Sequence, residues 1–261
     1  MIELRAIYIL WLREMKKLSR AKERIFGSLA MPIMFLAFLG LGFKNTSLPG
    51  LEHKISYVSF LVPGVIGLNM LFGSMFSGIS VLWDREFGFL KEIMVAPVSR
   101  TSIALGRVAG GMTMVIIQGT LLFLLSFIFH FSMGPHFSIL RELFGIAMMY
   151  VFMVLMSITF VSLGLAFASN MRDAQGFDLI INFVMFPLFF VSGALAPISN
   201  LPGWLRFFCY LNPLTYGVDG IRSALTQYSA IGLPIDLIVS VLVAFGMLSL
   251  ASYFFERSDS V

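Results

Sequence analysis

A short charged segment, VLWDREFGFLKEIMVAPVSR, separates two long apolar stretches of this sequence. Five of its first twelve residues are charged, whereas its neighbours on both sides are almost free of charge. Wound as a helix, the segment places Trp83, Phe87, Leu90 and Met94 on one narrow arc. A helix lying flat on lipid is one interpretation. Mixed charges around an apolar ridge fit a second one better, a helix that docks into a groove of a soluble protein.

Motifs for other kinds of chemistry are missing from the sequence. It contains no G-x-x-x-x-G-K-[ST] phosphate loop, no H-E-x-x-H metal motif and a single cysteine, Cys209. The charges nearest the apolar stretches lie at their ends, whereas ion-coupled carriers keep an ionisable group near mid-membrane. We therefore expect that this chain is not an enzyme and that it binds no metal or cofactor. If the protein transports a substrate, another chain must supply the energy.

The composition predicts an all-α polytopic membrane protein. Of its 261 residues, 58% are hydrophobic and 12% are charged, against about 25% charged residues in soluble domains. Since a bilayer is crossed by about 20 mostly apolar residues, six segments qualify as spans, and they leave no room for a separate soluble domain. The spans are 25–43, 57–82, 107–131, 143–169, 178–196 and 235–255.

The distribution of basic residues predicts the orientation. Six spans put both termini on one side of the membrane. Thirteen of the 18 basic residues fall on that side, in the N-terminal segment, in the loops after spans two and four, and in the tail. By the positive-inside rule, both termini and the charged segment are expected to lie in the cytoplasm. The membrane is expected to be the inner or plasma membrane of the cell.

Two segments outside the spans have amphipathic character. Residues 1–24 are basic on one helical face and carry Trp11 on the other, which predicts an interfacial helix on anionic headgroups. Residues 197–232 are apolar and aromatic, and Asn200 and Asn212 are candidate N-caps for two short helices there. We expect this outer loop to dip into the membrane or to cover the spans.

Two stretches carry a resemblance to a known family. FLVPGVIGLNMLFGSMFSGISVLWDREFGFLKEIMVAPVSRTSIALGR begins at Phe60, and FFVSGALAPISNLPGWLRFFCYLNPLTYGVDGIR begins at Phe189. Together with the span count and the basic N-terminal helix, they resemble the permease subunits of ABC-2 type transporters of the daunorubicin-resistance and nodulation-export kinds. The likeness covers nearly the whole chain as one transmembrane domain.

The resemblance implies a mode of action. Such a permease works with a separate ATP-binding subunit, which holds the ATP and Mg²⁺, usually as two permeases with two ATPases. It implies that 84–96 is a coupling helix in a cleft of the ATPase, that 1–24 is a connecting helix, and that 197–232 forms extracellular re-entrant helices. The candidate ATPase contacts are Asp84, Arg85, Glu86, Phe87, Gly88, Phe89, Lys91, Glu92 and Arg100.

The resemblance also places the cargo route along spans two and five, between protomers. The candidate route residues are Asn69, Ser74, Asn182, Phe186, Phe189 and Ser192. An interhelical hydrogen bond is the alternative role for the two asparagines. Asp219 and Arg222 stand three residues apart on the last outer helix, which predicts a structural ion pair.

The resulting expectation is the membrane subunit of an ATP-driven exporter, a homodimer in the lipid bilayer with no nucleic-acid partner. We favour a drug-like or lipid-like amphipathic cargo, as in multidrug efflux. Export of a polysaccharide or glycolipid precursor stays open, and so does a non-ABC membrane enzyme or carrier.

Overall fold

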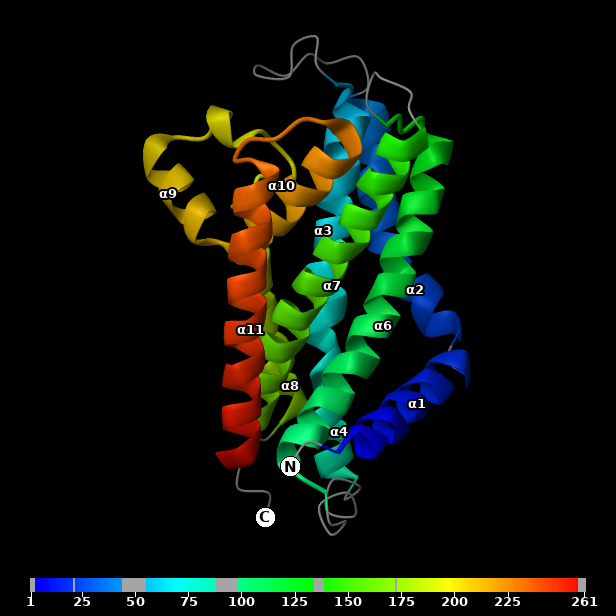
Figure 1. The fold of residues 1–261 in the computed structure, drawn as a ribbon, viewed down its shortest axis with the longest axis vertical. Coiled ribbons are helices and arrows are strands. Elements are labelled where there is room, and N and C mark those ends of the chain that lie inside the picture. The colour runs from blue at the N-terminus through cyan, green and yellow to red at the C-terminus, as the bar shows by residue number, and fades with distance from the viewer. Residues whose placement is uncertain are drawn as a thin grey trace.

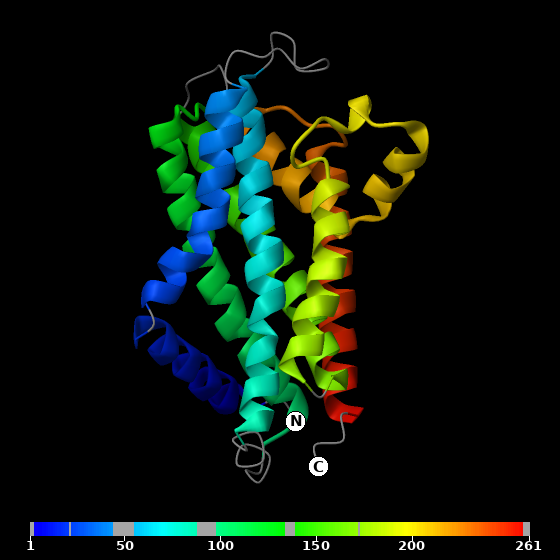
Figure 2. The ribbon, with the colours of Figure 1, turned by 180° about the vertical axis from the view of Figure 1, so that it is seen from behind.

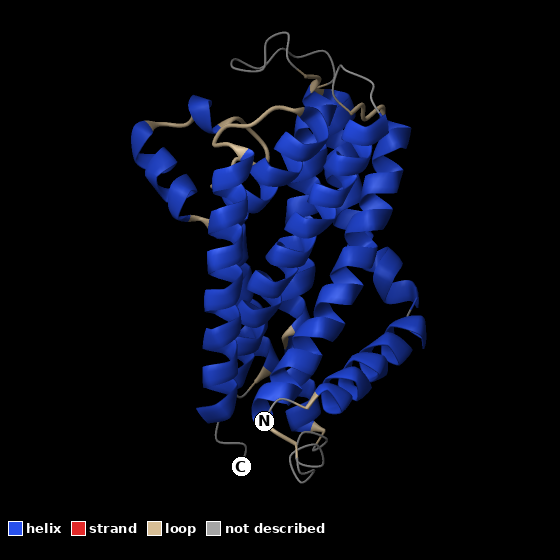
Figure 3. Cartoon of the chain, viewed as in Figure 1, coloured by secondary structure: helices blue, strands red, loops and turns tan. Residues whose placement is uncertain are grey.

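The structure is a computed structural model that describes residues 3–20, 22–43, 55–87, 98–133, 139–171 and 173–257. Every regular element within those ranges is helical (Figure 3). In chain order they are α1 (Leu4–Arg20), α2 (Lys22–Phe35), η1 (Leu36–Gly40), α3 (Tyr57–Ser77), α4 (Ile79–Glu86), α6 (Arg100–Ser126), η2 (Phe127–Phe129), α7 (Ile139–Asn170), α8 (Ala174–Phe190), η3 (Ile198–Asn200), α9 (Gly203–Leu211), α10 (Pro213–Thr226) and α11 (Leu233–Arg257).

Four of these helical segments are long and apolar enough to cross a membrane, judged within the described residues. They are Tyr57–Asp84, Arg100–Phe129, Ile139–Asn170 and Leu233–Arg257. Two further apolar helices are shorter, Gly27–Gly40 and Ala174–Phe190. The all-helical class and the polytopic character are thereby confirmed, while the count of six spans stays a prediction.

Several predicted boundaries were wrong. The span predicted at 107–131 belongs to a helix that begins earlier, at Arg100, because Ser99 caps it by accepting a hydrogen bond from the Ser102 N–H. The segment predicted to run to 196 is helical only to Phe190. Asn212 does cap α10, through the Leu214 N–H, whereas Pro202 and not Asn200 occupies the N-cap of α9.

α3 lies at the centre of the bundle and α11 at its edge (Figures 1 and 2). In the most apolar window of each span, 72% of the residues of the α3–α4 segment are buried in the protein, against 17% for α11. Since a helix that is apolar all round and unburied must face lipid or another chain, α11 is an outer helix and α3 is core.

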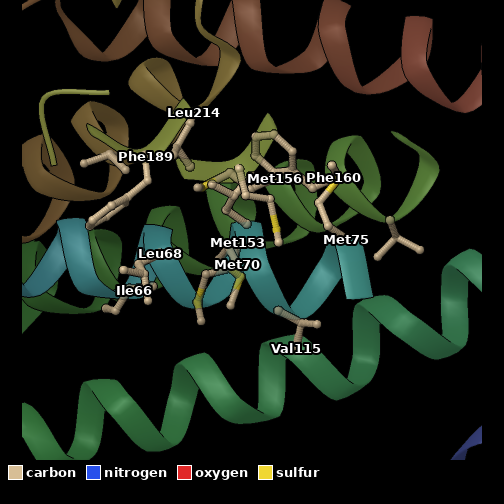
Figure 4. Close-up of a cluster of buried hydrophobic side chains, with 14 of the residues drawn as sticks. Ile66, Leu68, Met70, Met75, Val115, Met153, Met156, Phe160, Phe189 and Leu214 are labelled. Atoms are coloured by element: carbon tan, nitrogen blue, oxygen red, sulfur yellow. The ribbon is translucent and has the colours of Figure 1, made fainter. Parts of the chain in front are cut away.

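The core is formed chiefly by α3 and α7, whose methionines and aromatic rings interleave (Figure 4). The two backbones touch: a Cβ atom added to Gly78 would lie 2.6 Å from the carbonyl carbon of Gly164. Such close approach is the usual way for membrane helices to gain packing energy, since lipid tails provide no hydrophobic drive between them.

Both ends of the bundle carry helices that do not run with it. α1 slants across the end where α11 finishes, packed on α6, and α9 projects sideways at the opposite end beyond α10 (Figure 1). The α9 side chains Trp204, Phe207 and Phe208 are exposed. This apolar surface suits the membrane interface, where amphipathic aromatic residues gather.

Candidate functional site

A cluster of charged side chains joins three helices at the α1 end of the bundle. The Asp84 carboxylate, on α4, accepts hydrogen bonds from Arg13 of α1 at 2.7 and 3.1 Å and from Arg107 of α6 at 2.8 Å. Lys17 Nζ stands 3.9 Å from Asp84 and 3.1 Å from Glu14. We call these five residues the Asp84 cluster.

The centre of the Asp84 cluster, formed by Asp84 and Arg107, is shielded from water. The Asp84 side chain is 10% exposed and that of Arg107 is 5% exposed. In such surroundings, removing one partner leaves a buried charge without compensation, which typically costs about 3–5 kcal/mol. The cluster therefore holds α1, α4 and α6 in one arrangement.

Further contacts seat α1 on α6. The Trp11 indole N–H donates to Thr113 Oγ1 at 3.0 Å, and the Glu3 backbone N–H donates to Ser102 Oγ at 2.9 Å. Gly106 and Gly110 let the helices come close, since a Cβ at Gly110 would lie 2.8 Å from the Glu14 side chain. Tyr8 and other apolar side chains on the outer face of α1 stay exposed.

The predicted ATPase contacts divide into three groups. Asp84 faces inward into the cluster, where Arg13 and Arg107 form ion pairs with its carboxylate. Phe87 is 83% exposed, and Arg100 donates to the Glu256 backbone carbonyl at 2.6 Å. The remaining candidates lie outside what the structure describes. For Arg85 and Glu86 this concerns the side chains only, and for the others it concerns the whole residue: Gly88, Phe89, Lys91 and Glu92.

The predicted route residues of α3 lie inside the protein. Asn69 Nδ2 donates to the Val115 carbonyl of α6 at 3.5 Å, an interhelical hydrogen bond. Ser74 is fully buried, and its hydroxyl finds no hydrogen-bond partner among the described residues. Asn69 also lines a cavity of about 240 Å³ between α2, α3 and α6, beside a Gln118–Ser28 hydrogen bond of 2.7 Å.

The predicted route residues of α8 and the turn after it are more varied. Asn182 donates to the Asp178 carbonyl of its own helix, and Ser192 to the Phe189 carbonyl. Phe189 is buried, whereas Phe186 is 39% exposed and stacks edge-on against Phe72 of α3. α3 and α8 therefore share an aromatic seam that reaches the surface.

Asp219 and Arg222 are both buried at the opposite end of the bundle, 3.9 Å apart. Asp219 accepts from the Ser229 hydroxyl and from the Ala230 and Ile231 N–H groups. Arg222 donates to the Phe60, Gly193 and Ala194 carbonyls. Burial lowers the pKa of Arg222 to about 10 while Asp219 opposes that shift, so the guanidinium stays charged at neutral pH.

Sequence reasoning missed the partners of Asp84. Arg13 and Arg107 were visible only as members of a basic count, although lone charges at the ends of apolar stretches generally need partners. Within the described residues, no three His, Cys, Asp or Glu side chains gather as a metal site would require.

The fold and these sites together define a polytopic helical membrane protein with charged clusters at both ends of its bundle. Comparison with known proteins makes the assignment specific. The chain belongs to the ABC-2 type transporter family, which matches residues 5–226.

Several relatives of the chain are named as permeases. It is 31% identical over 205 residues to "putative transport permease ycf38" of Pyropia yezoensis, covering 78% of this chain and 68% of that protein. It is 25% identical to "inner membrane transport permease YadH" of Escherichia coli, covering 92% of this chain and 90% of that protein. "Probable multidrug ABC transporter permease YbhR" of the same species is 25% identical, over 67% of this chain and 45% of that protein.

Proposed function

We propose that this chain is the membrane-spanning subunit of an ATP-driven exporter and that it works with a separate ATP-binding subunit. Membership of the ABC-2 family implies such a partner. The Asp84 cluster is the observation that carries the proposal. It fixes α1, α4 and α6 to one another directly beside the charged segment that we predict to dock on the ATPase.

The cluster would make a stiff mechanical connection. α4 follows α3 with a break of one residue at Gly78, and α3 is the most buried helix of the bundle. A push on the segment at 84–96 would move α4, and through Asp84 it would move α1 and α6 together. Packed cores pass on displacements of this kind because they deform little.

The orientation belongs to the same proposal. With six spans, both termini and the 84–96 segment face the cytoplasm, and α9 and α10 form re-entrant helices on the outside. The thirteen basic residues counted on the cytoplasmic side support this orientation, and so does the α9 surface, which is apolar enough to enter lipid.

Two copies of the chain would face each other through α8. One face of α8 is exposed and apolar, formed by Leu179, Phe183, Phe186 and Phe190. In this proposal the aromatic seam of α3 and α8 lines a route between protomers, which opens alternately to either side as two ATPases close and open.

We propose an amphipathic, drug-like or lipid-like cargo. The aromatic seam is apolar, and the polar route candidates Asn69, Asn182 and Ser192 already bond within the chain. The word "multidrug" in the name of one relative agrees with this choice. A polysaccharide precursor is the alternative, and it would need more free polar groups than the route candidates that the structure describes, among which the Ser74 hydroxyl is without a hydrogen-bond partner.

ATP-dependent uptake into inside-out vesicles tests the proposal. Vesicles holding the chain and a candidate ABC ATP-binding subunit from the same organism should accumulate amphipathic dyes, and a Walker-lysine variant of the ATPase is the control. Uptake of a lipid-linked glycan instead would replace the cargo. Accumulation independent of ATP would refute the exporter.

A further inference from the structure

A cavity of about 320 Å³ lies beside the Asp84 cluster, between α1, α4 and α6. That volume is within the range of small-ligand sites. Its charged lining consists of Glu14 and Lys17 of α1, Asp84 of α4 and Arg107 of α6, and its apolar lining includes Leu18, Trp83 and Met114. The cavity therefore has a charged part, with two cations and two carboxylates, beside an apolar part.

Arg107 has hydrogen-bonding capacity that the protein leaves unused. Its Nη2 donates to Asp84, but Nε and Nη1 are buried and find no acceptor among the described residues. A guanidinium carries five N–H donors in a planar fork, and buried donors without acceptors are costly. An oxyanion in the cavity would satisfy the free side of the fork in the way that arginines bind phosphate.

The local charge also favours an anion. Arg13, Lys17 and Arg107 surround Asp84, and Glu14 is the second carboxylate of the cluster, so one positive charge is in excess. Arg13 and Arg107 occupy both Asp84 oxygens at 2.7 and 2.8 Å. Lys17 is itself paired with Glu14 at 3.1 Å, so the unused donors in the cavity lining are those of Arg107, and Lys17, whose side chain is 46% exposed, stands beside them.

The side chains around the cavity also suit the membrane interface. α1 has its apolar side chains Leu4, Tyr8 and Ile9 exposed, as a helix at the membrane interface has. Trp83, which interfacial sites favour, is 39% exposed on the cavity wall. An amphiphile whose phosphate lies beside Arg107 would place its apolar part against Leu18 and Met114.

We propose that this cavity binds the phosphate of an anionic amphiphile, with Arg107 and Lys17 as its ligands and the Trp83 wall against its apolar part. The proposal is independent of the ATPase and of the cargo route. The phosphate could belong to a lipid headgroup or to a soluble phosphate compound.

Titration of the purified full-length chain in neutral detergent separates these sources. The probes are dihexanoyl phosphatidic acid, dihexanoyl phosphatidylcholine and inorganic phosphate. We expect phosphatidic acid to bind at least about tenfold more tightly than the other two. Phosphatidylcholine has no net charge, which costs it about one charge-assisted hydrogen bond, and inorganic phosphate has no acyl chain to bury. If inorganic phosphate binds as tightly as phosphatidic acid, the site stands and the lipid source is refuted.

Matched variants locate the binding. Lys17→Gln should weaken phosphatidic acid binding about tenfold, whereas Lys16→Gln, an exposed neighbour outside the cavity, should leave it unchanged. Ser80→Phe fills the cavity and keeps every charge, so it should abolish binding without lowering the melting temperature. Arg107→Gln is a further test if it folds. Equal binding of both lipids, or equal loss in the two lysine variants, would overturn the site.

Discussion

Arg107 and Arg222 are both almost fully buried, but the protein satisfies them differently. Arg222 donates to three backbone carbonyls, lies beside Asp219 and stacks on the Phe60 ring at 3.8 Å. Arg107 makes one hydrogen bond, to Asp84, within the described residues. A fully satisfied buried cation belongs to a fixed part of the structure, whereas unused donors belong to a place where something binds.

Arg222 should accordingly be a determinant of stability. Arg222→Gln removes the charge and breaks contacts that join α10 to α3 and to the turn after α8, so we expect a loss of about 3 kcal/mol or more. Thermal unfolding in detergent measures this loss as a fall in melting temperature. Arg206→Gln is the control, because Arg206 is exposed and donates to the Leu201 and Ser199 carbonyls just before its own helix. An equal, small effect of both variants would contradict the structural role.

At the scale of the helices, α1 packs closely on α6. At Gly110 of α6 an added Cβ atom would meet the Glu14 side chain, whereas at Gly246 of α11 it would meet no atom within 4 Å. The two glycines are both helical, and they differ in whether a neighbouring helix covers them.

This difference gives a matched pair of substitutions. Gly110→Ala should destabilise the protein by about 1–3 kcal/mol through overpacking and speed hydrogen exchange in α1. Gly246→Ala should stabilise it by up to about 1 kcal/mol, since alanine favours helix. If both variants behave alike, α1 is not held on α6 as described.

The long helices could be predicted from the sequence, because about 20 apolar residues in a row have few alternatives to a span. Caps at Ser99 and Asn212 were also predictable, since their side chains act on residues two or three positions away. The break at Gly78 and the pairing of Asp84 with Arg13 were not. They depend on which helices meet, and one sequence does not contain that information.

At the scale of the whole molecule, α8 and α11 both present apolar surface, but we propose that only α8 meets a second copy. Phe183→Cys on α8 should give a cross-linked dimer with a short bifunctional reagent. Leu242→Cys on α11, also exposed and apolar, should not. The natural Cys209 is buried, so it should contribute little background cross-linking. Dimers from both variants, or from Leu242→Cys alone, would contradict an α8 interface.

The most direct test of the central claim is co-purification of the chain with a candidate ABC ATP-binding subunit from the same organism. We predict a complex with equal numbers of permease and ATPase chains. The double charge reversal Arg85→Glu with Glu86→Arg should disrupt the complex and leave the melting temperature of the permease unchanged. Reversing Arg141→Glu and Glu142→Arg, at the opposite end of the bundle, should leave the complex intact. Failure of the wild-type pair to associate, or equal association of both double variants, would contradict the account.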